Sequence, residues 1–346
     1  MSVARHLTFE VNEASQVGQV RRAAAHMADE MGLDLVAAGR VALVATELGT
    51  NLVRHARRGR LLVAPVVGDN GLPMLEFLSL DQGPGIADLA ACMADGYSTG
   101  GTPGTGLGAV RRLADEFDAF STMPHGTVIM ARVGVRPGLG ASTVMPPAAK
   151  AQFVVGAVNL AFPGEIVSGD AWAFAADGQR AALLVADGLG HGPEAAEASH
   201  EAVRVFRVAP FDAPGKVIDQ VHQALRTTRG AAVALANVDL IARKVLFCGV
   251  GNIAGRLISG VEDRSMASQH GTAGVQIRRV TDLAYDWPAH GLLIMHSDGL
   301  TARWDVKGAS ALLRQHPTVV AAWLMRDHCR GRDDATVVVV KWRGAS

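Results

Sequence analysis

Residues 183–199 read LLVADGLGHGPEAAEAS, an aliphatic run that ends in an acid and several glycines. The run predicts a buried strand ending at Asp187-Gly188, and Pro193 opens a stretch with helical periodicity. An Asp-Gly pair after a strand is, by itself, typical of a turn. The interpretation of this motif therefore depends on whether other predicted strands of this half of the chain also end in acids that could lie close to Asp187.

Three further acidic motifs lie at the ends of predicted strands: Ser168-Gly169-Asp170, Ser297-Asp298-Gly299 and Asp333-Asp334-Ala335. We expect the sheets to bring these carboxylates to one edge, where their charges would repel one another unless cations were bound. Oxygen ligands without a Cys or His cluster favour Mg²⁺ or Mn²⁺. Two such ions can bind a phosphate ester and activate a water for attack.

The pattern around these motifs alternates between strands and helices. Strands are predicted at 153–161, 171–175, 181–186, 231–240, 244–249, 292–296 and 335–342, and helices at 193–208, 213–228 and about 319–329. Strands that enclose a pair of helices indicate stacked sheets covered by helices.

The chain has 346 residues, which suggests about two domains. The segment GVRPGLGASTVMPPAAK at 134–150 is rich in Gly, Pro and Ala and has no apolar periodicity. We therefore expect a first domain at 1–133, a linker at 134–151 and a second domain at 152–346.

Composition disfavours some classes of partner. Lys+Arg and Asp+Glu both number 33, so no net basic charge attracts nucleic acid or an anionic membrane, and neither partner is expected. The start of the chain lacks the apolar segment of a signal peptide, and no apolar run approaches the ~20 residues that span a bilayer, so we expect a cytoplasmic protein. The three cysteines have no paired spacing and are expected to be incidental thiols.

The first half predicts an α/β sandwich. Its pattern gives strands at 6–11, 61–67 and 74–80, helices at 14–31, 34–56 and 106–117, and a hairpin of 118–122 with 126–133. Glu47, Asn51 and His55 are four residues apart and project from nearly one helix face, so they can share a ligand.

Two glycine-rich motifs follow in the first half. In DQGPGI, 81–86, Asp81 ends a strand and can accept a hydrogen bond from an adenine amino group, while Gly83 and Gly85 let the base approach the backbone. In GGTPGTGLG, 100–108, a loop leads into a helix and offers backbone N–H groups to phosphate.

The first half resembles the GHKL ATPase family, and in particular its small bacterial serine kinases of the RsbT and RsbW type. ATELGTNLVRHA is similar to the N box, DQGPGI to the first glycine box and TPGTGLGAVRRLADEF to the second. The resemblance implies a Bergerat-type sandwich that binds ATP or ADP with Mg²⁺. It implies that Asn51 binds Mg²⁺, Glu47 activates the substrate hydroxyl, and the nucleotide contacts Asp81, Gly83, Gly85, Gly104, Thr105, Gly106, Leu107 and Gly108.

The second half is similar to the SpoIIE and RsbX branch of the metal-dependent serine/threonine protein phosphatases, on the motifs PGEIVSGDAW, LLVADGLGHGPEAAEAS, IMHSDGLT and GRDDATVVVV. This resemblance implies an αββα sandwich with two Mg²⁺ or Mn²⁺ ions. It implies that Asp187 bridges both ions, that the Gly188 carbonyl also binds, and that the remaining ligands are Asp170, Asp298 and Asp333, with Asp334 as the alternative to Asp333. His191 is a candidate proton relay or a polar residue at a helix entry.

Together the two halves predict a bifunctional regulator of bacterial partner switching. It would phosphorylate a STAS-domain antagonist or similar regulatory protein and also remove such a phosphate, with a sigma factor as a further candidate partner. The alternative is a nucleotide-gated module that sequesters a partner, as an anti-sigma factor does, and regulates the attached phosphatase without transferring phosphate.

Overall fold

The computed structural model describes residues 5–93, 106–136, 152–278, 280–288 and 290–344. The chain divides into two units, one of His6–Lys150 and one of Met1–Arg5 with Ala151–Ser346. Residues 137–151 of the expected linker lie outside the described residues. All five tryptophans of the sequence belong to the second unit.

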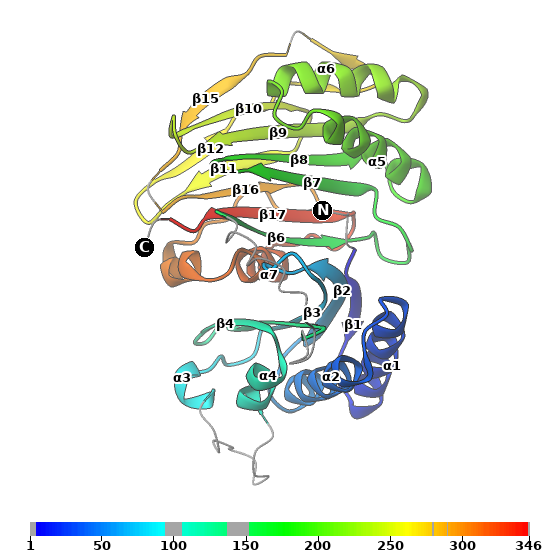
Figure 1. Ribbon diagram of the computed structural model, residues 1–346, viewed down its shortest axis with the longest axis vertical. Coiled ribbons are helices and arrows are strands. Elements are labelled where there is room, and N and C mark those ends of the chain that lie inside the picture. Colours follow the sequence, from blue (N-terminus) through cyan, green and yellow to red (C-terminus); the bar gives the residue numbers. More distant parts are fainter. Residues whose placement is uncertain (1–4, 94–105, 137–151, 279, 289, 345–346) are drawn as a thin grey trace, which may run out of the picture. The chain divides into compact units, whose positions relative to one another are not determined.

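The first unit is a single sheet with helices on one face (Figure 1). Its strands pair antiparallel in the order β1-β2-β3-β5-β4. Along the chain the elements are β1 (Leu7–Glu10), α1 (Ala14–Glu30), α2 (Leu35–His55), β2 (Arg60–Val67), β3 (Pro73–Asp81), α3 (Leu89–Cys92), α4 (Leu107–Leu113), β4 (Glu116–Thr122) and β5 (Gly126–Gly134).

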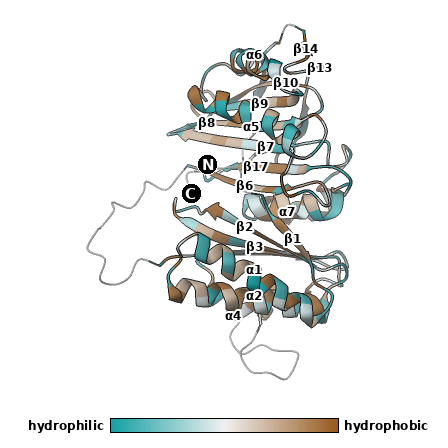
Figure 2. Cartoon of the chain, turned by 90° about the vertical axis from the view of Figure 1, so that its right-hand side faces the viewer, coloured by the Kyte–Doolittle hydropathy of each residue, from teal (hydrophilic) through white to brown (hydrophobic). Residues whose placement is uncertain are grey.

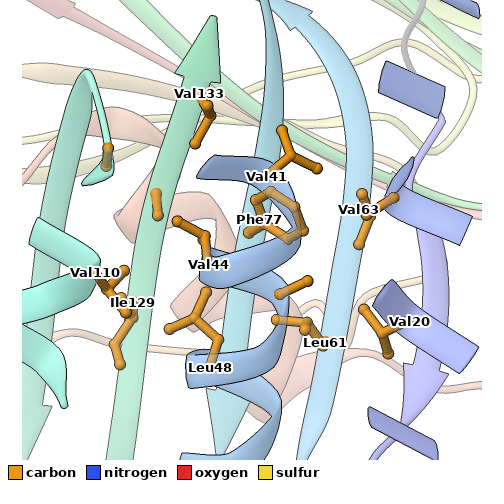
Figure 3. Packing of buried hydrophobic residues seen from close by; sticks show 14 of the residues in the cluster. Val20, Val41, Val44, Leu48, Leu61, Val63, Phe77, Val110, Ile129 and Val133 are labelled. Carbon is orange, nitrogen blue, oxygen red and sulfur yellow. The ribbon is translucent and has the colours of Figure 1, made fainter. Parts of the chain in front are cut away.

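Helix α2 supplies most of the contact between helices and sheet. It begins where the Asp34 carboxylate accepts a hydrogen bond from the Ala37 N–H at 2.7 Å, which satisfies one free donor of the first turn. Its stripe of Val41, Val44 and Leu48 is fully buried and faces Phe77 of β3 (Figure 3). This helix is long and apolar enough to cross a membrane, but it packs here as the core helix of the first unit.

The helix predicted at 106–117 is shorter than expected, because α4 ends at Leu113 and β4 begins at Glu116. The Asp115 N–H donates to the Arg132 carbonyl at 2.8 Å, and the Asp115 carboxylate pairs with Arg40 at 2.9 Å. These tertiary contacts outweigh the local helical pattern and turn the chain into the sheet.

The second unit holds two five-stranded sheets, in the orders β15-β10-β9-β8-β7 and β12-β11-β16-β17-β6. Along the chain its elements are β6 (Phe153–Leu160), β7 (Asp170–Asp177), β8 (Arg180–Gly188), α5 (Pro193–Val208), α6 (Pro214–Ala224), η1 (Leu225–Thr227), β9 (Ala231–Asp239), β10 (Lys244–Val250), β11 (Ala254–Ile258), β12 (Asp263–Met266), β13 (Gly271–Thr272), β14 (Gln276–Ile277), β15 (Leu283–Asp286), β16 (Leu292–His296), η2 (Lys307–Arg314), α7 (Pro317–His328) and β17 (Ala335–Trp342).

The two sheets form the inner layers of an αββα sandwich (Figures 1 and 2). Side chains of both sheets, such as Leu183, Val185, Leu293 and Val338, fill the space between them. Helices α5 and α6 cover the first sheet through a separate cluster that includes Phe206 and Val221. Helix α7 covers the second sheet and packs on β6 and β17.

Strands β11 to β15 were not predicted from the sequence. They are short, and β12 is exposed at three of its four positions, so it lacks an apolar alternation that could reveal it.

Candidate functional site

The acids of the second unit do gather where the strands end. Asp170, the first residue of β7, lies directly opposite Asp187 near the end of β8. Two like charges at opposed positions of an antiparallel pair are unfavourable unless something neutralises them. This edge of the first sheet therefore holds two carboxylates that need a proton or a cation.

The pKa values of these two aspartates reflect their burial and the repulsion between the neighbouring carboxylates. Burial, followed by the charges of Asp170, Asp298, Asp333 and Asp334, raises the pKa of Asp187 to about 9. Burial also raises the pKa of Asp170 to about 7, although a hydrogen bond from Ser297 acts in the opposite direction. A site that retains protons on carboxylates near neutral pH is suited to exchange them for divalent ions.

The second sheet brings the remaining acids to the same place. Asp298 follows β16, where burial and the charge of Asp333 raise its pKa, and its Oδ2 accepts a hydrogen bond from Asn252 Nδ2 at 2.6 Å. Asp333 is half-buried just before β17. The next residue, Asp334, is buried and its Oδ1 accepts from the Phe162 N–H at 2.8 Å. Asp334 thus fastens the start of β17 to the loop after β6.

Glycines beside these acids allow close approach rather than tight turns. A Cβ on Gly188 would lie 2.0 Å from the Ala195 carbonyl oxygen in the first turn of α5, and one on Gly299 would lie 2.0 Å from the Asp334 carbonyl oxygen. Neither glycine has a positive φ. The Asp-Gly pattern is typical of a turn, but at these two positions glycine is needed because another segment of backbone lies too close for a Cβ.

His191 has partners that the sequence did not indicate. Its ring stacks on Phe162, with centroids 4.2 Å apart, and its Nδ1 lies 2.9 Å from Glu165 Oε1. Both partners come from the loop between β6 and β7, so the loop after β8 is held against the loop that precedes Asp170.

The donor set fits divalent cations in its chemistry. Asp170 Oδ1 is fully buried and finds no hydrogen-bond partner among the described residues, so it is an oxygen available to an ion. Among the described residues, however, no three His, Cys, Asp or Glu side chains already stand close enough to enclose one ion. Binding would therefore require the carboxylates to turn toward the metal.

In the first unit, Glu47, Asn51 and His55 occupy the second half of α2, as the spacing predicts. Glu47 and Asn51 are half-buried and His55 is exposed. Burial raises the pKa of Glu47, while Arg54 on the next turns acts against the rise. A carboxylate with a raised pKa is better matched to accept a proton near neutral pH.

The loop after β3 lies next to the end of α2. The Asp81 carboxylate accepts a hydrogen bond from the Gly83 N–H at 2.7 Å, and a Cβ on Gly83 would meet the His55 carbonyl oxygen at 2.8 Å. Gly85 has a φ of +76°, and a Cβ there would lie 2.5 Å from the Thr122 carbonyl oxygen. Both positions require glycine, for space and for backbone conformation respectively.

The second glycine motif is described only in part. Gly106 precedes α4, and Leu107 and Gly108 in its first turn are buried against the core of the unit. The predicted phosphate contacts Gly104 and Thr105 lie outside the described residues.

The sequence interpretation overlooked four residues of the phosphatase-like site: Asn252, Ser297, Phe162 and Glu165. Ser297 is next to the predicted ligand Asp298 in the sequence. Its hydrogen bond to Asp170, however, forms only because the two sheets pack against each other. Glu165 lies in the motif PGEIVSGDAW but has no role predicted there, and Asn252 lies in none of the quoted motifs.

Comparison with known proteins assigns both halves. Residues 10–133 match the family model described as "Histidine kinase-like ATPase domain", and residues 177–343 match "Stage II sporulation protein E (SpoIIE)". The serine/threonine-protein kinase RsbT of Bacillus subtilis (strain 168) is 38% identical over 123 residues, which are 36% of this chain and 87% of RsbT.

The second half has similar relatives. The phosphoserine phosphatase RsbX of the same organism is 29% identical over 90 residues, 26% of this chain and 45% of RsbX, so the chain spans less than half of that relative. A chain from a solved structure described as "The bacterial stressosome: a modular system that has been adapted to control secondary messenger signaling" is 28% identical with a TM-score of 0.52. That match covers 54% of this chain and 98% of the other.

Proposed function

Because the chain belongs to the histidine kinase-like ATPase domain family through residues 10–133 and carries a SpoIIE-family phosphatase domain in residues 177–343, we propose that it is a bifunctional cytoplasmic partner-switching regulator. Its first unit would phosphorylate a Ser or Thr of a STAS-domain regulatory protein, and its second would remove such a phosphate. The similarity to a kinase, RsbT, and to a phosphoserine phosphatase, RsbX, supports this pairing.

The observation that carries the phosphatase half is the opposition of Asp170 and Asp187 with three more aspartates in electrostatic reach. Asp187 would bridge two Mg²⁺ or Mn²⁺ ions, the Gly188 carbonyl and Asp170 would bind on the side of the first sheet, and Asp298 and Asp333 on the side of the second. Asp334 stays the alternative to Asp333, because each carboxylate has one oxygen engaged: the Asp334 N–H donates to Asp333 Oδ1 and the Phe162 N–H donates to Asp334 Oδ1. When bound, the ions supply a water of lowered pKa for in-line attack on the phosphate ester.

The surrounding residues would orient this site and handle protons. Glu165 and Phe162 hold the His191 ring in one orientation, with Nδ1 toward Glu165. Nε2 is then left to take up the proton released by the attacking water and to pass it to the leaving Ser or Thr oxygen. Asn252 holds Asp298 through its Oδ2.

A phosphatase assay tests this half. With Mn²⁺, the purified protein should hydrolyse a phosphoserine peptide, and Asp187→Asn should reduce the rate to background. Asp177→Asn is the matched control, because Asp177 ends the neighbouring strand β7, away from the Asp170–Asp187 pair, and forms an ion pair with exposed Arg180. Equal activity in the unmodified protein and in the Asp187→Asn variant would refute the assignment.

For the first unit we propose that Asn51 binds Mg²⁺, that Asp81 with Gly83 and Gly85 receives adenine, and that the Gly104–Gly108 loop receives the phosphates. Glu47 would accept the proton of the substrate hydroxyl, supported by its raised pKa. Labelled ATP and a candidate STAS-domain protein should give phosphotransfer, which Glu47→Gln should abolish while ATP binding is retained. ATP binding without transfer in the unmodified protein would instead favour the sequestering module, with a sigma factor among its candidate partners.

A further inference from the structure

Asp170 is tied to the opposite sheet as well as to its own. It begins β7 in the first sheet, is almost completely buried, and has its Oδ2 2.6 Å from the hydroxyl of Ser297. Ser297 directly follows β16 in the second sheet. One short hydrogen bond therefore crosses the sandwich beneath the carboxylates.

The proton of the Ser297 hydroxyl has a fixed direction. The Thr336 N–H donates to Ser297 Oγ at 3.0 Å, and the Ser297 N–H donates to the Thr336 carbonyl at 3.0 Å. Because Thr336 fills the acceptor side of the hydroxyl, its single proton is left for Asp170. Ser297 thus acts as a donor toward the carboxylate.

A second bond holds the backbone of Asp170 at the same place. Asn159 Nδ2 donates to the Asp170 carbonyl at 3.1 Å and to Thr336 Oγ1 at 2.9 Å. Asn159, Ser297 and Thr336 are all fully buried. With its main chain and Oδ2 engaged, Asp170 has Oδ1 left for a ligand, a buried atom for which the described part of the chain supplies no hydrogen-bond partner.

The position of Ser297 in the chain links both sides of the site. Its neighbour Asp298 is a proposed ligand on the side of the second sheet, while its hydroxyl orients the proposed ligand on the side of the first. Groups that orient metal ligands by hydrogen bonds commonly change metal affinity 10–100-fold when removed.

We infer that Ser297 is a positioning residue that aims Asp170 Oδ1 at a divalent cation and so sets the affinity of the ion bound on the side of the first sheet. The inference rests on the proposed phosphatase function for the identity of the ligands. It assigns Ser297 no contact with substrate and no part in the chemical step.

Mn²⁺ binding measured without substrate tests the inference, with free Mn²⁺ followed by electron paramagnetic resonance. Ser297→Ala should weaken one of the two Mn²⁺ sites, the one that Asp170 serves, by roughly 10- to 100-fold and leave the other within a few-fold. At saturating Mn²⁺, kcat with a phosphoserine peptide should stay within a few-fold of the unmodified protein, because the ligands themselves remain. Ser297→Cys, which fills the same space with a weak donor, should show the same loss and serves if the alanine variant does not fold.

Ser259→Ala is the control, since Ser259 is also buried but its hydroxyl accepts from the Val261 and Glu262 N–H groups of a turn after β11 and contacts no proposed ligand in the described residues. Its Mn²⁺ affinity should match the unmodified protein. A folded Ser297→Cys variant with affinity within twofold of the unmodified protein would overturn the inference. No Mn²⁺ binding by the unmodified protein would instead refute the proposed phosphatase function.

Discussion

Glu76 is a buried carboxylate of the first unit that pairs with Arg132 and His6. It is buried, Arg132 Nε lies 2.6 Å from its Oε2, and His6 Nε2 lies 3.0 Å from its Oε1. Burial favours the protonated form, but Arg132 and then His6 outweigh it and lower the pKa of Glu76 to about 2. Because this value lies below the ordinary 4.5, the stabilisation is complete above pH 4.5 and is lost as the pH falls toward about 2.

We expect Glu76→Gln to lower the free energy of unfolding of the first unit by about 3 kcal/mol at pH 7, because Arg132 and His6 lose a buried partner. The difference from the unmodified protein should shrink as the pH is lowered through the range between the two pKa values. Urea titrations followed by far-UV circular dichroism at pH 7 and at lower pH measure it. Glu10→Gln, at an exposed position of β1, is the control, and a cost independent of pH would contradict the pKa assignment.

At the scale of elements, α2 contains two glycines in opposite surroundings. A Cβ on Gly39 would meet no atom within 4 Å, whereas one on Gly49 would lie 3.0 Å from Val17 Cγ1 in α1. Gly39→Ala should therefore stabilise the first unit by about 0.5–1 kcal/mol through helix propensity. Gly49→Ala should destabilise it by about 1 kcal/mol or more, because the gain in propensity is outweighed by overpacking against Val17.

Urea midpoints of the two variants, measured without nucleotide, test this comparison. Equal shifts for both would mean that the helices α1 and α2 move apart freely, contrary to the close packing of Gly49 on Val17.

Elements with strong periodicity were predictable, and those defined by tertiary pairing were not. The apolar stripe of Val41, Val44 and Leu48 predicts helix α2, and the aliphatic run before Asp187 predicts strand β8. By contrast, α4 ends early because Asp115 bonds to Arg132 and Arg40, which are distant in sequence. The gathering of the aspartates was predictable from strand ends, while Ser297 and Asn252 depend on contacts across the sandwich that no spacing records.

At the scale of the whole molecule, each unit has a hydrophobic core of its own. The helices of the first unit pack on one sheet, and the second unit buries a layer between two sheets and another beneath α5 and α6. A ligand that binds only one folded unit should stabilise that unit alone. Since all five tryptophans lie in the second unit, their fluorescence follows its unfolding, while far-UV circular dichroism follows both.

We therefore expect two unfolding transitions with separate ligand responses. Mn²⁺ should stabilise only the unit whose unfolding the tryptophans follow, and ADP added at constant Mg²⁺ should stabilise only the other unit. Each ligand should raise the free energy of unfolding of its unit by about 2.7 kcal/mol at 100 times its dissociation constant. Asp187→Asn should abolish the first response and leave the second intact, and Asn51→Ala should do the reverse. A single transition that both ligands shift would contradict independent cores and would instead favour nucleotide control of the phosphatase unit, because only energetically coupled units share the stabilisation from either ligand.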